Sequence, residues 1–281
     1  MSIVRVRNRS GKGFIFLTGA TGLLGSYILH NLLMRNENVA VLVRPGRKET
    51  AEHRISKILS HWRKELGGVV PMPKVFSGDL SEPGRLEELY GRCKSVIHCA
   101  ASLTFYGAQG EEPWASNVDG TKRILDFCDA AGVPDMHYVS TAYVAGSSRI
   151  FSEQDLDIGQ ELRNDYEKSK FEAEKIVRSA DFLKRLTVYR PSIVVGDSAT
   201  GYTTTFHGFY AVLKLAHTMV SRLPMGSTSG RNLLTALGMN GSERKNFVPV
   251  DWVTDVFDHI FTHPELHGQT YHLTTDRKSV V

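Results

Sequence analysis

Cysteine is scarce in this sequence, with three residues among 281. Cys93, Cys99 and Cys128 are odd in number, and no two of them form a C-x-x-C pair. This pattern argues against a disulfide framework and a cysteine-ligated zinc site, and it is typical of proteins from a reducing compartment. We therefore expect three thiols that pack in the core.

Long hydrophobic runs are also lacking. No stretch of about 18 apolar residues is present, and no continuous apolar segment follows the basic N-terminus, so the sequence predicts neither a membrane span nor a secretory signal peptide. A large excess of one charge is absent too, because 34 Lys and Arg residues nearly balance 30 Asp and Glu residues, for a net charge of +4. We expect a cytoplasmic protein without a nucleic-acid partner.

Metal-binding motifs are not found either. Histidine is frequent, with 11 residues, and His259 and His263 have the four-residue spacing of a pair on one helix face. No H-E-x-x-H motif accompanies them, and no carboxylate lies between them to act as a general base. We expect no metal and interpret both histidines as solvated or helix-ending.

The sequence does contain a regular alternation of strand and helix patterns. Strand patterns occur at 39–43, 74–76, 95–98, 136–139, 186–193 and 270–273, and helical patterns at 49–66, 85–90, 114–131, 165–182 and 206–223. Strands that alternate with helices pair in parallel through crossovers, so we predict an α/β fold with a doubly wound parallel sheet of the Rossmann type. We divide the chain into a dinucleotide-binding core (1–196), a small substrate lobe (197–246) and a return to the core (247–281).

The predicted substrate lobe is rich in Gly, Ser and Thr. Ligands of such sheets bind beyond the carboxyl ends of the strands, where a late excursion of this kind usually selects the substrate. Its helical pattern carries apolar residues that either line an acyl pocket or pack the helix onto the sheet. The spacing leaves both interpretations open for Phe209, Val212, Leu213, Leu215, Ala216 and Met219.

A turn with three glycines joins the first strand pattern to a helix. Gly19, Gly22 and Gly25 are spaced by three; the first permits the tight turn, the second lets the main chain approach a pyrophosphate, and the third lets the helix pack closely on the strand. The unpaired amides at the helix start then face an anion. Such a turn alone can be a simple connection, but its place between strand, helix and strand is typical of a dinucleotide site.

The second strand ends at Arg44, where an NAD-preferring site has an acidic residue for the ribose 2′-hydroxyl. Arg47 and Arg54 follow nearby, and a guanidinium group matches phosphate oxygens well. We therefore predict NADP(H) as the cofactor. The alternative is that these arginines are solvated surface charges.

Tyr166 and Lys170 are four residues apart at the start of a helical pattern, so both project from one face. A cation beside a phenol lowers the pKa of the phenol toward the working pH, which suits a proton donor to a carbonyl group under reduction. Thr141 follows the strand pattern at 136–140, at the edge where ligands of such sheets bind. Its hydroxyl can bind the same carbonyl oxygen.

Taken together, these motifs resemble those of the extended short-chain dehydrogenases/reductases, from about Gly13 to the C-terminus. The family's markers occur in order as T-G-A-T-G-L-L-G (18–25), G-D-L (78–80), H-C-A-A-S (98–102), N-V-D-G-T (117–121), S-T-A-Y-V-A-G (140–146), Y-E-K-S-K (166–170) and R-P-S-I-V-V-G-D (190–197). The resemblance implies that Tyr166 protonates the substrate oxygen, Lys170 holds the nicotinamide ribose and tunes the phenol, and Thr141 orients the carbonyl.

The same resemblance implies the cofactor contacts. Asp79 and Leu80 would border the adenine, Ala100 and Ala101 would pass beside the cofactor, and a later group would lie near the nicotinamide. The full implied set is Gly19, Thr21, Gly22, Leu23, Leu24, Arg44, Arg54, Asp79, Leu80, Ala100, Ala101, Ser102, Asn117, Tyr166, Lys170, Pro191, Ser192 and Val194.

Within that superfamily the chain is most similar to thioester reductases, which include the reductase domains of carboxylic acid reductases and nonribosomal peptide synthetases and are related to fatty acyl-CoA reductases. L-V-R (42–44) with Arg54 ten positions later, A-A-S-L-T-F (100–105) and G-D-S-A-T-G (196–201) carry this similarity. The implied reaction is hydride transfer from NADPH to the carbonyl of an acyl thioester, either a small molecule or bound to a carrier. It gives a hemithioacetal that collapses to an aldehyde and a free thiol.

Alternatives stay open. The chain could instead reduce or oxidise a free ketone, alcohol or nucleotide sugar, or it could bind NADP without catalysis, although the intact Thr141, Tyr166 and Lys170 disfavour the latter. A homodimer is expected only by analogy with the superfamily. Thioester reductases usually continue beyond the last strand pattern, so an end at Val281 predicts a small or shortened substrate lobe.

Overall fold

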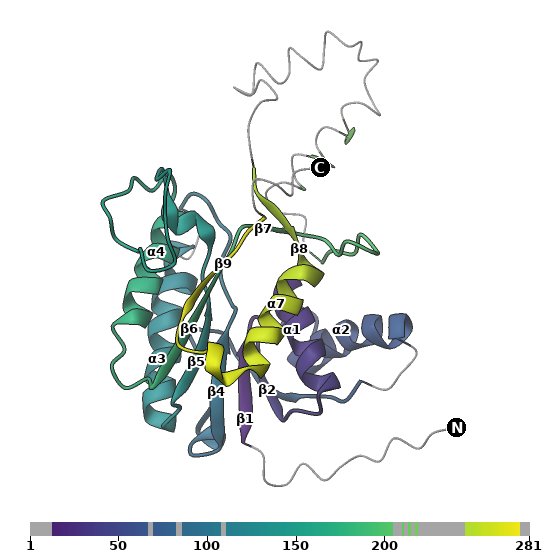
Figure 1. The fold of residues 1–281 in the computed structure, drawn as a ribbon. Coiled ribbons are helices and arrows are strands. Elements are labelled where there is room, and N and C mark those ends of the chain that lie inside the picture. The colour runs from purple at the N-terminus through teal and green to yellow at the C-terminus, as the bar shows by residue number, and fades with distance from the viewer. Residues whose placement is uncertain are drawn as a thin grey trace.

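A computed structural model describes residues 13–66, 70–82, 86–107, 111–204, 210, 213–214, 217–218 and 245–275. Its centre is a seven-stranded parallel sheet with the strand order β3-β2-β1-β4-β5-β6-β9 (Figure 1). The strands are β1 (Phe14–Thr18), β2 (Val39–Val43), β3 (Lys74–Ser77), β4 (Cys93–His98), β5 (Asp135–Val139), β6 (Arg185–Pro191) and β9 (Thr270–Leu273). This confirms the prediction of a doubly wound Rossmann-type sheet.

Helices cover both faces of the sheet (Figure 1). They are α1 (Leu23–Met34), α2 (Ala51–Leu66), α3 (Gly120–Ala131), α4 (Asp165–Arg178) and α7 (Val250–Thr262), with short turns at Leu86–Leu89, Ala115–Asp119, Ala142–Ala145 and Pro264–Leu266. Side chains alternate along β1, so Ile15 and Leu17 pack with α1, α2 and α7, whereas Phe16 packs with α3 and α4. The β2 strand is buried throughout, as expected for a parallel strand covered on both faces.

Several predicted elements have different bounds in the structure. The strand predicted at 186–193 ends at Pro191, and the chain then forms β7 (Ile193–Val195), which pairs with β8 (Phe247–Pro249) in a separate two-stranded sheet. Proline has no N–H to continue a ladder, which explains the break. The helix predicted at 85–90 is one 3₁₀ turn among the described residues, and the helix predicted at 165–182 ends at Arg178.

Most of the predicted substrate lobe lies outside the described residues. This applies to 205–209, 211–212, 215–216 and 219–244, and hence to nearly all of the helix predicted at 206–223. Of its proposed pocket residues, Leu213 is described and is 46% exposed. Among the described segments, no helix is both long and apolar enough to cross a membrane.

The three thiols do not share one environment. Cys93 and Cys128 are buried in the core beside α3, as predicted, and burial raises the pKa of the Cys93 thiol to about 12. Cys99 follows β4 and is partly exposed, because it stands where the strand leaves the sheet. It still packs against the core, and burial raises the pKa of its thiol to about 12, so Cys99 is a thiol at the rim of the core.

Candidate active site

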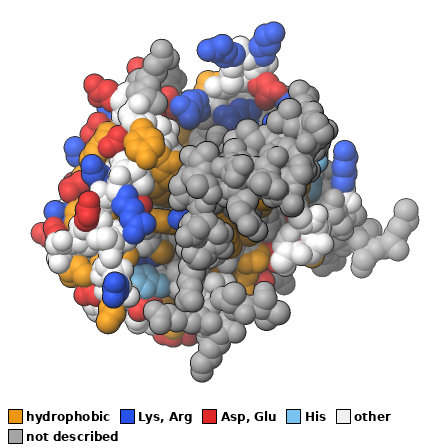
Figure 2. All heavy atoms as spheres, turned by 90° about the horizontal axis from the view of Figure 1, so that it is seen from above, with side chains coloured by type: hydrophobic (Ala, Val, Ile, Leu, Met, Phe, Trp, Pro, Cys, Tyr) orange, Lys and Arg blue, Asp and Glu red, His pale blue; other side chains and the backbone are white. Residues whose placement is uncertain are grey.

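The carboxyl ends of β1, β4, β5 and β6 point to one end of the molecule, as parallel strands require. That end is the upper one in Figure 1, and Figure 2 looks onto it, with Lys and Arg side chains along the upper edge of the view. The glycine turn, the Ala100–Ala101 segment, Thr141 and Pro191 each follow or end one of these four strands. The fold therefore brings motifs from distant parts of the sequence to one edge.

The glycine turn is closed by backbone contacts that exclude side chains. Gly19 has φ +77, and a Cβ there would stand 2.6 Å from the amide nitrogen of Ala100. A Cβ on Gly25 would stand 2.1 Å from the carbonyl oxygen of Gly19. The third glycine thus lets α1 pack directly on the turn, as the sequence indicated.

The first turn of α1 is left open to an anion. Its N-cap is Gly22, which offers no side-chain cap, and the first turn contains no acidic residue. Uncapped N–H groups and the positive end of the helix dipole favour phosphate at such a place. The turn and the helix start therefore fit the pyrophosphate of a dinucleotide.

We predict that Gly25→Ala weakens the binding of a nicotinamide dinucleotide by about 5- to 150-fold, because overpacking of this size costs about 1–3 kcal/mol and must displace the turn. Fluorescence titration with NADPH measures the effect. Gly132→Ala is the matched control: Gly132 ends α3 at φ +65, and a Cβ there meets nothing within 4 Å. That variant should lose some stability but keep its affinity for NADPH, and equal affinities for all three proteins would contradict the assigned role of Gly25.

A cavity of about 290 Å³ opens beside the turn. Eight of the predicted cofactor residues line it: Gly19, Thr21, Arg44, Arg54, Asp79, Leu80, Ala100 and Ala101. The cavity also has walls that the sequence did not indicate: Thr18, Leu42, Gly78, Ser81, Glu112, Ala115 and Ser116. Thr18 and Gly78 belong to the T-G-A-T-G-L-L-G and G-D-L motifs, which indicate their positions, whereas the loop before N-V-D-G-T contains no pattern that indicates Glu112.

Basic side chains stand at one part of this cavity. The Arg54 guanidinium donates to the carbonyl oxygen of Arg44 and to the Thr21 hydroxyl at 3.5 Å, so it bridges the segments that follow β2 and β1. Arg44 is exposed and lies close enough to Asp79 to lower the pKa of that carboxyl. Burial raises the pKa of Asp79, but hydrogen bonds from Ser81 and Glu82, together with Arg44, leave it below its usual value.

A reciprocal cap fixes the start of α4, where Tyr166 lies. The side chain of Asn164 accepts from the Glu167 backbone amide at 2.9 Å, and the Glu167 carboxylate accepts from the Arg163 amide at 2.8 Å. The loop after β4 is tied to the same turn, because the Asp165 amide donates to the Phe105 carbonyl at 2.9 Å. The Phe105 ring meets the Tyr166 ring edge-on at 5.9 Å between centroids.

The hydroxyls of Thr141 and Tyr166 lie together. Thr141 is 3% exposed, accepts from the Tyr143 amide at 3.2 Å and donates to the Pro191 carbonyl at 3.4 Å, which fixes its side chain between β5 and β6. The Thr141 side chain also lies close enough to the Tyr166 phenol to oppose, in part, the rise of its pKa. The two groups can therefore bind one oxygen atom together.

The pKa of Tyr166 differs from the sequence-based prediction. Burial of the phenol raises its pKa to about 12, and this outweighs the effect of Thr141. Lys170 does not act on it as predicted, because its ammonium group donates instead to the Tyr138 hydroxyl at 2.9 Å and to the Val139 carbonyl at 2.8 Å. The predicted lowering of the Tyr166 pKa by Lys170 is therefore wrong for the protein alone, and the phenol stays protonated at neutral pH.

Of the three predicted nicotinamide-side residues, Ser192 has a side-chain polar group that is available to a ligand. Pro191 ends β6, and Ser192 follows it with a buried hydroxyl that has no hydrogen-bond partner among the described residues. An unsatisfied buried hydroxyl is costly, so a polar ligand group fits there. Together with the open start of α1, this orphaned hydroxyl fits a dinucleotide that runs along the carboxyl ends of the strands.

Other predicted cofactor residues face the protein interior. Asn117 is 1% exposed, and its amide binds the Ser102 backbone and the Ser169 hydroxyl. It is therefore placed to hold Ser102 rather than to line the cavity. Leu23 is buried in the core and Leu24 packs against it, so only their backbone groups are available at the helix start.

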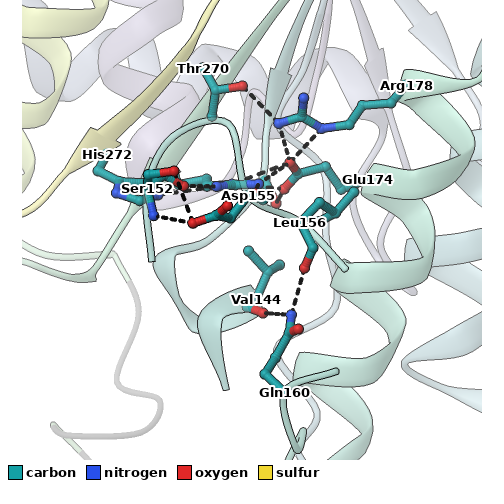
Figure 3. A network of polar contacts seen from close by, with 11 residues as sticks. Val144, Ser152, Asp155, Leu156, Gln160, Glu174, Arg178, Thr270 and His272 are labelled. Atoms are coloured by element: carbon teal, nitrogen blue, oxygen red, sulfur yellow. Dashed lines mark hydrogen bonds and ion pairs between the residues drawn. The ribbon is translucent and has the colours of Figure 1, made fainter. Parts of the chain in front are cut away.

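A buried ion pair behind the site was not predicted. Arg190 on β6 and Glu174 on α4 are both fully buried and pair at 2.7 Å. Figure 3 shows how the network continues: Arg178 reaches both Glu174 and Thr270. Arg190 also binds the carbonyls of Ser152 and Asp155 and the ring of His272.

This network borders the site on two sides. Ser140, next to Thr141, donates to Glu174 at 2.6 Å, and Arg190 immediately precedes Pro191. The loop before α4 is held separately, because the Gln160 amide bridges the carbonyls of Val144 and Leu156, each at 2.7 Å (Figure 3). The network of Arg190 and Glu174 therefore holds together the segments that carry Thr141, Ser192 and Tyr166.

A family model described as the male sterility protein family matches residues 17–257. The nonribosomal peptide synthetase asaC of Aspergillus flavus is 29% identical in an alignment 292 residues long, which covers 93% of this chain and 26% of that protein. The non-canonical nonribosomal peptide synthetase cpsA of Aspergillus campestris is 30% identical over 285 residues, covering 93% and 26%. The chain thus spans about a quarter of these curated relatives.

Solved structures agree with this family. The terminal R domain from the myxalamid PKS-NRPS biosynthetic pathway is 28% identical with a TM-score of 0.73, covering 95% of this chain and 67% of that one. The reductase (R) domain of a nonribosomal peptide synthetase from Mycobacterium tuberculosis shares the fold at 21% identity and a TM-score of 0.69, covering 96% and 68%. These findings confirm the sequence-based resemblance to thioester reductase domains.

Proposed function

This chain belongs to the male sterility protein family, and we propose that it reduces acyl thioesters to aldehydes with NADPH. The observation that carries the proposal is the meeting of the Thr141 and Tyr166 hydroxyls beside buried Lys170, next to a cleft with the features of a dinucleotide site. The reductase domains among its relatives and structural neighbours support the same substrate class.

The proposed reaction has two steps, hydride addition to the thioester carbonyl and loss of the thiol. Bound NADPH supplies the hydride that adds to the thioester carbonyl carbon. Tyr166 donates a hydrogen bond to the carbonyl oxygen, where negative charge develops, and transfers its proton to that oxygen. The Thr141 hydroxyl, which donates to the Pro191 carbonyl in the protein alone, turns its one hydrogen to the same oxygen. The resulting hemithioacetal breaks its C–S bond, releasing the aldehyde while the sulfur leaves as a thiol with the proton returned from the hydroxyl.

Lys170 would hold the nicotinamide ribose and keep a positive charge beside the reacting groups. Burial lowers the pKa of Lys170 to about 8, while Cys99 and Glu174 act to raise it. The ammonium form is therefore lost as the pH rises through about 8, well below the pKa of Tyr166. In this scheme turnover falls on the alkaline side because Lys170 loses its charge before Tyr166 loses its proton.

A substrate comparison tests the proposal. The loss of NADPH absorbance is followed with acyl-CoA, with an acyl group on a carrier protein and with simple ketones, and the products are trapped as hydrazones. We expect turnover of a thioester with formation of aldehyde and thiol. Turnover confined to ketones or alcohols would instead support a dehydrogenase of the same superfamily.

We predict that Arg44→Ala weakens NADPH binding by about 10- to 100-fold and leaves NADH binding nearly unchanged, because a charged hydrogen bond to phosphate contributes about 1.5–3 kcal/mol. Titrations with both dinucleotides measure the ratio of affinities. Arg47→Ala is the matched control, since Arg47 is also exposed and lies nearby in the sequence but does not line the cavity. An unchanged preference in Arg44→Ala would contradict the assignment of NADPH.

A further inference from the structure

Lysine side chains are usually exposed to solvent, but Lys170 is buried and its ammonium group has fixed hydrogen-bond partners. It is 2% exposed, and its ammonium group donates to the Tyr138 hydroxyl at 2.9 Å and to the Val139 carbonyl at 2.8 Å. The Tyr138 ring also lies beside the charge, with its centroid 4.4 Å from Nζ. An ammonium has three N–H donors, so two are fixed by β5 and one is left for a ligand.

Tyr138 is itself held by a chain of buried polar groups. It is fully buried, which raises the pKa of its phenol, and Thr121 lies close enough to oppose that shift in part. The Thr121 hydroxyl donates to the Asn117 carbonyl at 2.6 Å. The Thr121 hydroxyl is 3.1 Å from Nε2 of His98, and Nδ1 of His98 is 2.7 Å from the Thr18 hydroxyl. Thr18 in turn accepts from the Ala100 amide at 3.2 Å.

This series of hydrogen-bonded groups therefore ends at the cofactor cleft, because Thr18 and Ala100 both line the cavity. Its members come from β1, β4, α3, β5 and α4. They are all inside the core apart from Ala100, so their positions are set by packing rather than by solvent. A side chain within such a network is well suited to fix the direction of its neighbour.

We propose that Tyr138 is a positioning residue for Lys170: its phenol oxygen, aligned by Thr121 and His98, fixes the ammonium so that its remaining donor serves the nicotinamide cofactor. The inference rests on the proposed role of Lys170 in cofactor binding. It does not depend on the identity of the acyl substrate.

The charges around Lys170 make the effect measurable. Two ionisable groups of α4 lie near the Lys170 ammonium and Tyr138, namely the Glu174 carboxylate and the Tyr166 phenol. The Cys99 thiol and His98 face the ammonium from the end of β4, and Tyr138 faces it from β5. Burial lowers the pKa of His98 to about 3, so its ring is neutral and adds no competing charge. Without the Tyr138 oxygen, a buried N–H would have no partner, and the pKa of Lys170 would fall further below about 8.

The test is Tyr138→Phe, which keeps the ring and removes the hydroxyl. The Kd for NADPH is measured by fluorescence between about pH 6 and 9.5, without any thioester. We expect the pH at which affinity is lost to fall by about one unit, so that NADPH binds about fivefold more weakly at pH 8 and almost normally at pH 6. We call the pH at which affinity is lost the midpoint. Should Tyr138→Phe fail to fold, Thr121→Val should lower the midpoint as well, by a smaller amount.

Tyr189→Phe is the matched control. Tyr189 is 1% exposed on the neighbouring strand β6, and its hydroxyl bonds to His137 at 2.9 Å, so this variant also loses one buried hydrogen bond. It should keep the wild-type midpoint. A wild-type midpoint in Tyr138→Phe, or in Thr121→Val if only that variant folds, would overturn the proposal. If Lys170→Gln also bound NADPH normally at every pH, the assigned role of Lys170 would fail as well.

Discussion

Replacement of Tyr166 by Phe is expected to lower kcat for thioester reduction by about 10²- to 10⁴-fold, the usual contribution of a positioned general acid. The substitution removes the O–H that would protonate the carbonyl oxygen and keeps the ring that packs edge-on against Phe105. NADPH affinity should be nearly unchanged, because the ring and the cap of α4 stay in place. Steady-state kinetics and NADPH titration on the same preparation separate the two effects.

The structure also predicts how this loss depends on pH. Burial raises the pKa of Tyr166 to about 12, so the acid is protonated from pH 6 to 10 and the activity ratio of wild type to variant stays large throughout. Tyr189→Phe, which removes a buried phenol outside the site, should retain normal kcat. Undiminished activity of Tyr166→Phe would mean that another group protonates the oxygen.

Loss of the buried ion pair is expected to have the largest effect on stability. Arg190→Met leaves the Glu174 carboxylate buried without its main partner, which should lower the free energy of unfolding by about 3–5 kcal/mol. This is a large part of the total of about 5–15 kcal/mol typical of folded proteins. Denaturant unfolding, followed by far-UV circular dichroism, measures it.

The matched control comes from the same strand. Arg185 pairs with Asp135 through two hydrogen bonds, but its side chain is 47% exposed, so Arg185→Met should cost about 1 kcal/mol or less. The double variant Arg190→Met with Glu174→Leu removes both buried charges and should recover part of the loss. Equal destabilisation by Arg190→Met and Arg185→Met would contradict the importance of burial at Arg190.

The parts of the site that follow from local pattern were predictable from the sequence. Gly19 and Gly25 were identified because a tight turn between strand and helix requires glycine at both places. Arg44 was identified because it ends the second strand of the dinucleotide motif, and it does line the cavity beside Asp79. The sheet followed from the regular alternation of strands and helices.

Contacts between distant segments were not predictable in this way. The spacing of Tyr166 and Lys170 indicated a direct effect of the charge on the phenol, but it contained nothing about Tyr138, which attracts the ammonium toward β5. Burial, which raises the pKa of Tyr166, is likewise a property of the packed site rather than of the motif. The same holds for Arg190 on β6 and Glu174 on α4, whose pairing depends on how the helix packs against the sheet.

The most direct test of the account is the fate of the transferred hydride. The chain is incubated with an acyl thioester on a pantetheine arm and with NADPH that carries deuterium at the transferable C4 position, and the products are analysed by mass spectrometry. The account predicts an aldehyde with a single deuterium at C1 and an equal amount of free thiol. An aldehyde without label, or label found only in a secondary alcohol when a ketone is offered, would contradict it.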